Sequence, residues 1–206
     1  MYLTKLNLEL NNRTSLSLIS DCQKMHSYIM GGFPSIDSNK AREDMGILYQ
    51  VKVHKSEALV YIQSEEKPDP LKYTLAKAEI KDVSGLKEIL HNGMVFRFTL
   101  FANPAVRKKI RPEDRNSKRI FIADYEDRMK WLNRKLSDGG AELISAAEAS
   151  SETIRGKRGK ASIEAIGVHW EGILKITDQG EFWSMLQKGI GHEKAYGMGM
   201  LMLQKY

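Results

Sequence analysis

The sequence repeats one order of predicted elements in its two halves, and this repeat limits the possible folds more than any other feature. Residues 2–10 alternate apolar and polar side chains, which is typical of a half-buried strand. Residues 15–30 follow with apolar side chains at helical spacing. The first half is therefore predicted to contain a strand at 2–10, a helix at 15–30, strands at 47–54 and 58–63, a short helix at 71–78 and a strand near 79–82.

The second half starts the same order again. Asp124 is placed to cap one helix, and Asp178 with Glu181 has the spacing of a capping box at another. Strand, helix, strand, strand, helix, strand is the split βαβ or ferredoxin-like order. We therefore expect an α+β protein of two tandem ferredoxin-like (βαββαβ, RRM-like) domains, at residues 1–88 and 89–206. The predicted elements of the second half are strands at 94–101, 141–149, 163–176 and 198–203, with helices at 124–136 and 178–188.

Composition narrows the class of protein. The net charge of +6 favours a polyanionic partner without naming it. The single cysteine, Cys22, excludes an internal disulfide framework and a multi-cysteine zinc site. The opening MYLTKLNLEL lacks the features of a signal peptide, and no apolar stretch approaches the roughly 18 residues that span a bilayer. We expect a cytoplasmic protein that does not bind membranes.

Two clusters of positive charge lie in the second half. Residues 107–119 hold seven basic and two acidic side chains without apolar periodicity, which predicts an exposed loop. The second cluster surrounds Gly156 and Gly159 at a predicted hairpin tip, and a basic β-ribbon of this kind can enter a widened nucleic-acid groove. Solvated surface is the alternative for either cluster. The basic residues are Arg107, Lys108, Lys109, Arg111, Arg115, Lys118 and Arg119 in the first cluster, and Arg155, Lys157, Arg158 and Lys160 in the second.

The paired stacking aromatics of an RNA-recognition sheet are not visible in the sequence, which favours a grip on folded or duplex RNA by its shape.

The chain ends in a glycine-rich segment, residues 189–206. Backbone N–H groups beside a lysine can seat a phosphate, but the segment lacks the GxxxxGK[ST] pattern of a nucleotide-binding loop. We therefore expect a glycine-rich hairpin against a polyanion, with a turn that binds nothing as the alternative. The expected contacts are Gly189, Gly191, His192 and Lys194.

None of the five histidines stands in an HxxxH or HExxH pattern, and acidic residues do not cluster around any of them, so we expect no metal site and no cofactor. His26 follows Met25 on the first helix, about 100° from the apolar stripe, where an imidazole can be partly desolvated and still reach a ligand. Metal-free RNA cleavage requires a base for the 2′-hydroxyl or an acid for the 5′-oxygen, and positive charge at the phosphorus. His26 with Lys160 or Lys194 could fill these roles; a boundary histidine without a catalytic role is the alternative.

Four segments carry a family resemblance: MYLTKL at the start, FRFTLFANP at 96–104, DRMKWLNRKL at 127–136 and GIGHEKAYGMGML at 189–201. They resemble the CasE family of CRISPR precursor-RNA endoribonucleases, which belong to the Cascade complex. The resemblance covers almost the whole chain in matching order.

The resemblance implies tandem ferredoxin-like domains that bind the stem-loop of a CRISPR repeat RNA. It also implies metal-independent cleavage at the 3′ base of the stem, which leaves a 2′,3′-cyclic phosphate. The product then stays bound with the other Cascade subunits, and the protein is a monomer outside the complex. The basic hairpin of the family corresponds to residues 155–160.

The catalytic histidine of the family stands in a Tyr-x-x-His pattern that matches His26, but Gln23 replaces the tyrosine. Glutamine can hold RNA or a water molecule and cannot act as a phenolic acid, so either His26 works with less help or Tyr28 substitutes. Gln23 and Lys24 are expected to contact the RNA. Because of Gln23, a non-catalytic RNA-holding subunit is one alternative, and a small-molecule enzyme on the same scaffold is another.

Overall fold

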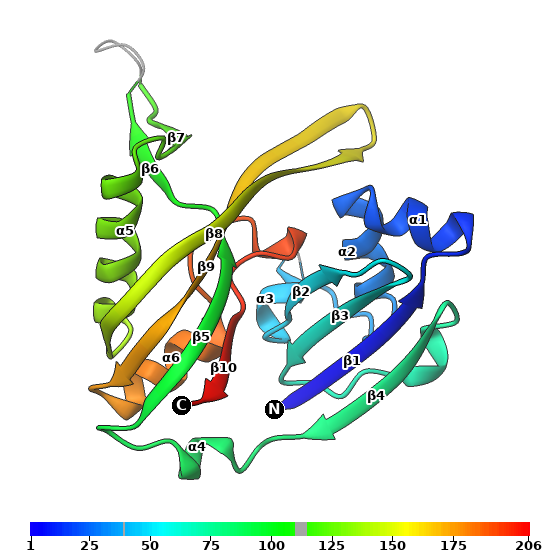
Figure 1. Ribbon diagram of the computed structural model, residues 1–206. Helices are drawn as coiled ribbons and strands as arrows, with labels where there is room; N and C mark the ends of the chain where they lie inside the picture. The colour runs from blue at the N-terminus through cyan, green and yellow to red at the C-terminus, as the bar shows by residue number, and fades with distance from the viewer. Residues whose placement is uncertain (39, 110–114) are drawn as a thin grey trace.

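The computed structural model describes residues 1–38, 40–109 and 115–206, and its main strands form two antiparallel four-stranded sheets (Figure 1). In the first sheet the strand order is β2-β3-β1-β4, with β1 paired to both β3 and β4. This is the ferredoxin-like order, in which the first and third strands are central. The strands are β1 (Tyr2–Glu9), β2 (Leu48–Val53), β3 (Glu57–Ser64) and β4 (Ala76–Asp82).

The predicted helix at 15–30 is wrong in one respect, because two helices replace it: α1 (Arg13–Ile19) and α2 (Cys22–Met30). The break comes at Asp21, whose extended backbone (φ −134°) ends one helix and whose side chain caps the next. Its carboxylate accepts hydrogen bonds from the backbone N–H groups of Gln23 and Lys24. Helix α2 then buries Met25 and Ile29 against the first sheet.

The predicted helix at 71–78 is also wrong. Only a short 3₁₀ turn, η1 (Pro70–Lys72), forms there, and the following residues belong to β4. The alternation of Ala76, Ala78 and Ile80 fits the ladder with β1 better than a helix. A one-turn helix that the sequence did not predict, α3 (Ala41–Asp44), precedes β2. The expected domain boundary at 88/89 falls inside α4 (Leu86–Ile89), which links the two sheets.

The second sheet has the order β10-β5-β9-β8 and carries the complete predicted order of elements. Asp124 and Asp178 cap the two helices as expected. Trp131 and Leu132 from one helix and Phe182 from the other are buried against the sheet. The tandem ferredoxin-like fold is thus confirmed. The elements are β5 (Val95–Ala102), α5 (Tyr125–Asp138), β8 (Ala141–Arg158), β9 (Ala161–Ile176), α6 (Gln179–Lys188) and β10 (Leu201–Lys205).

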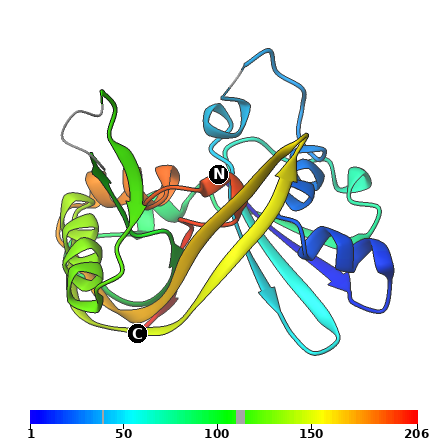
Figure 2. The same ribbon diagram turned by 90° about the horizontal axis from the view of Figure 1, so that it is seen from above.

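Strand β8 is 18 residues long, about twice the predicted length, whereas β9 begins only two residues before its predicted start. The two strands leave their sheet as a two-stranded ribbon. They stay paired as far as Arg158 and Ala161, with a turn at Gly159. Figures 1 and 2 both show the ribbon reaching from the second half to α1 and α2.

The predicted exposed loop at 107–119 is wrong in part, because both its ends are strands of a hairpin. Strands β6 (Ala105–Lys108) and β7 (Lys118–Phe121) pair antiparallel. Arg111 lies outside the described residues.

Side chains of the first half bond to the backbone of the second. The Tyr49 hydroxyl donates to the Ala195 carbonyl at 2.9 Å, and the Gln63 amide donates to the Leu186 carbonyl at 2.8 Å. Both Tyr49 and Gln63 are buried. The two halves are therefore held in a defined relation, which matters for any site between them. Among the described residues, no helix combines the length and apolar character needed to cross a membrane.

Candidate functional site

His26 lies in a pocket of about 330 Å³ at the junction of the two halves. Helix α2 and the residues in and before α3 form the side that belongs to the first half. The end of β8 and the 3₁₀ turn η2 (Lys194–Tyr196) form the side that belongs to the second. Arg42, Arg158 and Tyr196 join His26 in this pocket.

The His26 imidazole is half-buried, and its Nδ1 atom is buried without a hydrogen-bond partner in the described part of the chain. Nε2 is therefore the nitrogen that can meet a ligand. Burial lowers the pKa of His26, and the positive charges of Arg42 and Arg158 lower it further. The ring is neutral near pH 7 and suited to accept a proton.

The β8–β9 ribbon comes close to His26 because Gly156 lets its backbone pass over the start of α2. A Cβ atom at Gly156 would lie 2.7 Å from Cys22 Sγ and 3.0 Å from the Gln23 backbone nitrogen. Only glycine allows this approach. Two residues further along, Arg158 lies at the pocket.

Tyr196 is a pocket residue that the sequence analysis did not select. Its ring meets His26 edge-on, with centroids 6.3 Å apart and planes at 77°. Its hydroxyl lies 3.5 Å from Gln23 Oε1, to which it donates a hydrogen bond. Burial raises the pKa of Tyr196, so the phenol keeps its proton at neutral pH. The only signal in the sequence was its place in the glycine-rich segment.

The other residues expected on the first helix are not all at the pocket. Gln23 lines it, whereas the exposed Lys24 donates from Nζ to Ser17 Oγ at 2.6 Å. The Tyr28 hydroxyl accepts from the Leu75 backbone N–H at 3.3 Å. Its ring packs on Tyr73 with centroids 5.6 Å apart, so Tyr28 faces the core of the first domain and does not line the pocket.

Of the four basic residues on the ribbon, one lines the His26 pocket and three lie on the exposed surface outside it. Lys160 lies in the turn at the tip, exposed, and does not line the pocket, in contrast to Arg158. Arg155 and Lys157 are exposed on β8, and Arg155 pairs with Glu164 at 3.2 Å. Arg158 is therefore the ribbon cation that the structure brings to His26.

The glycines of the terminal segment make close contacts inside the protein. Gly189 (φ 70°) leaves no space for a Cβ, which would lie 2.8 Å from the Leu48 side chain. At Gly191 (φ 81°) a Cβ would come within 3.2 Å of the Trp131 ring. Residues 189–200 form a loop around η2 that leads into β10, whereas a hairpin was expected.

Positive charge continues from the β6–β7 hairpin to the pocket. Arg107 and Arg119 face each other across the hairpin. The pKa of His192 is lowered first by partial burial and then by nearby positive charges, which include Arg119 and Arg107. Burial and then Arg42 lower the pKa of Lys194, whose Nζ donates to the Lys188 carbonyl at 2.6 Å. Lys194 lines a second hollow beside the His26 pocket, and Arg42 lines both. Lys108 and Lys109 add exposed charge to the same hairpin.

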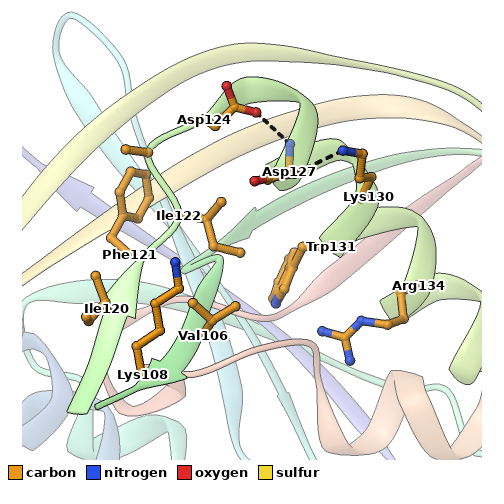
Figure 3. Close-up of a pocket in the computed structure, with 11 residues that line it drawn as sticks. Val106, Lys108, Ile120, Phe121, Ile122, Asp124, Asp127, Lys130, Trp131 and Arg134 are labelled. Atoms are coloured by element: carbon orange, nitrogen blue, oxygen red, sulfur yellow. Dashed lines mark hydrogen bonds and ion pairs between the residues drawn. The ribbon is translucent and has the colours of Figure 1, made fainter. Parts of the chain in front are cut away.

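A larger hollow of about 580 Å³ lies between the β6–β7 hairpin and α5 (Figure 3). Figure 3 shows Val106 of the hairpin and Ile122, just after β7, nearest to Trp131. The Asp127–Lys130 ion pair, 3.0 Å long, lies at the edge of the hollow. The Asp124 carboxylate is already used as the helix cap. Among the described residues that line this hollow there is no histidine, so size alone does not identify the candidate site. In the described ranges, no group of three or more His, Cys, Asp or Glu side chains could hold a metal ion.

The arrangement defines a class: tandem ferredoxin-like proteins with a histidine pocket and a cationic ribbon at the domain junction. The chain belongs to the family described as CRISPR associated protein, whose model matches residues 1–205. The CasE resemblance drawn from the sequence is confirmed.

Known relatives match along the whole chain. The CRISPR-associated endoribonuclease Cse3 of Thermus thermophilus is 24% identical over 216 residues, 98% of each chain. The solved CRISPR endoribonuclease Cse3 bound to a 19-nucleotide RNA is similar with a TM-score of 0.84 at 23% identity, over 99% of this chain and 100% of that one. Cas6e from Escherichia coli str. K-12 is similar with a TM-score of 0.75 at 23% identity. A chain of a CRISPR RNA-guided surveillance complex is similar with a TM-score of 0.75 at 20% identity. Each similarity covers 100% of both chains.

Proposed function

We propose that this protein is a metal-independent endoribonuclease that binds the stem-loop of a CRISPR repeat RNA and cleaves the precursor at the 3′ base of the stem. One observation carries the proposal: His26 of the first domain shares a pocket with Arg158 and Tyr196 of the second. Phosphodiester cleavage requires a group that transfers protons and positive charge that stabilises the transition state. A neutral imidazole beside guanidinium groups provides both. The family membership and the RNA-bound relative agree with this reaction.

In the reaction, the RNA 2′-oxygen forms a bond to phosphorus while the bond from phosphorus to the 5′-oxygen breaks. His26 accepts the proton of the 2′-hydroxyl, and as imidazolium it returns a proton to the departing 5′-oxygen. The products are a 2′,3′-cyclic phosphate and a 5′-hydroxyl, and no further reactant is consumed. Arg158 and Arg42 offset the negative charge that develops on the phosphoryl oxygens.

The stem is held by the cationic surfaces on either side of the pocket. The β8–β9 ribbon offers Arg155, Lys157 and Lys160 to one groove, and the path through Lys194 and His192 leads to the β6–β7 hairpin. These contacts with phosphate position the RNA, and they release counterions on binding. The glycines at 189 and 191 serve the site by packing the loop that carries Tyr196.

The product stays bound and the protein joins the other subunits of Cascade, in line with its similarity to a chain of a surveillance complex. Outside that complex we propose a monomer in the cytoplasm. A non-catalytic RNA-holding subunit is the second candidate, favoured by Gln23.

Incubation of the protein with repeat stem-loop RNA in EDTA tests the proposal. We expect a single cut and a product end that is a 2′,3′-cyclic phosphate, identified by mass spectrometry. RNA that is bound but stays intact, with and without added divalent cations, would favour the second candidate. Cleavage only after addition of a divalent cation would contradict the metal-independent reaction.

A further inference from the structure

We propose that Tyr196 is a second catalytic residue of the cleavage site, and that its hydroxyl donates a hydrogen bond to the scissile phosphate beside His26. This inference rests on the proposed function and goes beyond it by assigning a role to a side chain near the opposite end of the sequence from the histidine. Three observations carry it: the contact with His26, the bond to Gln23 and the rigid loop that carries the ring.

The contact with His26 gives the phenol its place in the pocket. The two rings meet edge to face, and both line the same cavity as Arg158. A phosphate that reaches the imidazole therefore passes next to the Tyr196 hydroxyl.

The hydroxyl is oriented by a chain of two hydrogen bonds on α2. Gln23 Nε2 donates to Ser27 Oγ at 3.3 Å, which turns Gln23 Oε1 toward Tyr196. The Tyr196 hydroxyl donates to this oxygen at 3.5 Å. A bond of this length is weak, so the hydroxyl can leave it for a phosphoryl oxygen at little cost. Gln23 is thus a positioning residue.

The turn that carries Tyr196 is fixed on both sides. Gly197 has a φ of 85°, and a Cβ there would lie 3.1 Å from the Tyr49 ring. The Tyr49 hydroxyl holds the Ala195 carbonyl at 2.9 Å. The buried Tyr49 thus fixes residues on both sides of Tyr196, so the phenol meets the pocket in a preorganised position, as a donor to a developing charge requires.

The phenol acts as a neutral donor. Its proton stays on oxygen throughout, and the hydrogen bond strengthens as charge grows on the phosphoryl oxygen in the transition state. The transfer of the proton from the 2′-hydroxyl to the 5′-oxygen remains the task of His26.

The substitution Tyr196→Phe tests the inference, because it keeps the ring against His26 and removes only the hydroxyl. We expect the single-turnover cleavage rate to fall by about 10²–10³, as for the loss of one donor to a developing negative charge. The dissociation constant for repeat RNA should change by less than about threefold, because the donor acts in the transition state. Tyr61→Phe, on β3 and outside the pocket, is the matched control and should cleave like the original protein.

A second variant separates chemistry from packing. Position 23 lies within 3.5 Å of the Tyr196 hydroxyl, so Gln23→Tyr in the Tyr196→Phe background returns a phenol to the same place. We expect this double variant to cleave at least tenfold faster than Tyr196→Phe alone, which a purely structural role of Tyr196 would not allow.

The outcomes distinguish this inference from the proposed function. Full cleavage by Tyr196→Phe, with His26→Ala inactive, would overturn the role of Tyr196 and leave the histidine site intact. Loss of cleavage in Tyr28→Phe together with full cleavage in Tyr196→Phe would assign the phenol to Tyr28 and overturn it as well. No cleavage by the original protein would overturn both proposals.

Discussion

His26 is subject to two opposing influences. Burial and two guanidinium groups disfavour its charged form, whereas its proposed ligand, the scissile phosphate, is an anion. In the protein without RNA, the pKa of His26 lies below the ordinary value of about 6.5 for a histidine side chain. The neutral form therefore dominates at physiological pH, where it can take the 2′-hydroxyl proton without first losing its own.

The pH dependence of cleavage follows from this environment. Acidification protonates His26 as the pH falls through its lowered pKa, so the single-turnover rate should decrease at acid pH and stay flat above about pH 6.5. A rate measured from pH 5 to pH 8 checks this. A rate that rises steadily toward acid pH would mean that His26 acts from its charged form.

The sequence placed His26 at the edge of the apolar stripe, and the structure finds it half-buried. Tyr196 could not be found in this way, because the distance in sequence between Tyr196 and Gln23 is 173 residues. The apolar periodicity of α2 cannot predict that the Tyr196 ring of the other domain packs next to it. The role of Tyr28 was expected from its nearness in sequence, but it lies around the helix from His26 and bonds to Leu75.

Among the elements, the β8–β9 ribbon depends on one glycine for its distance from α2. An added methyl group at Gly156 would collide with the sulfur of Cys22 and the backbone of α2, as well as the carboxylate of Asp21. The ribbon must then move, and Arg158 moves with it away from His26.

We expect Gly156→Ala to lower the stability by about 1–3 kcal/mol, the usual cost of overpacking, and to slow cleavage at least tenfold. Thermal unfolding and single-turnover cleavage measure the two effects. Gly85→Ala is the control, because no atom of the described residues, apart from its chain neighbours, lies within 4 Å of a Cβ there, and its backbone (φ −72°) accepts alanine. An unaltered cleavage rate in Gly156→Ala would show that the ribbon does not need this approach.

Element prediction succeeded where caps and periodicity agreed, as at Asp124 and Asp178. It failed where small side chains gave a weak pattern. Ala76 and Ala78 suit a helix by propensity, but the backbone of β1 offers them a strand ladder. The break at Asp21 was missed because the apolar spacing continues from Leu18 to Cys22 across it.

Across the whole molecule, the His26 pocket exists only because two domains of the same fold are fixed against each other. Tyr49 and Gln63 of the first domain bind backbone carbonyls of the second. The repeat in the sequence predicted the two domains, whereas their docking depends on side chains far apart in the chain. The glycine-rich end, which suggested a phosphate loop, serves this docking at Gly189 and Gly197.

The distribution of charge leads to a prediction for RNA binding. Replacement of Arg155, Lys157 and Lys160 by alanine should weaken binding and reduce the salt dependence of the association constant by roughly one unit of slope per lost phosphate contact. Titrations between 50 and 300 mM salt, roughly the range in which counterion release is measured, give the slope. The control removes the same number of positive charges at Lys77, Lys81 and Lys87, which are exposed on β4 and α4. An equal slope in both variants would place the RNA away from the ribbon.

The most direct test of a histidine site at the domain junction compares the original protein with His26→Ala on repeat stem-loop RNA in EDTA. Cleavage and binding are measured in the same samples. The account predicts a loss of cleavage by about 10²–10⁴, the usual contribution of a general base, with RNA binding retained. Cleavage by His26→Ala at the original rate would contradict it.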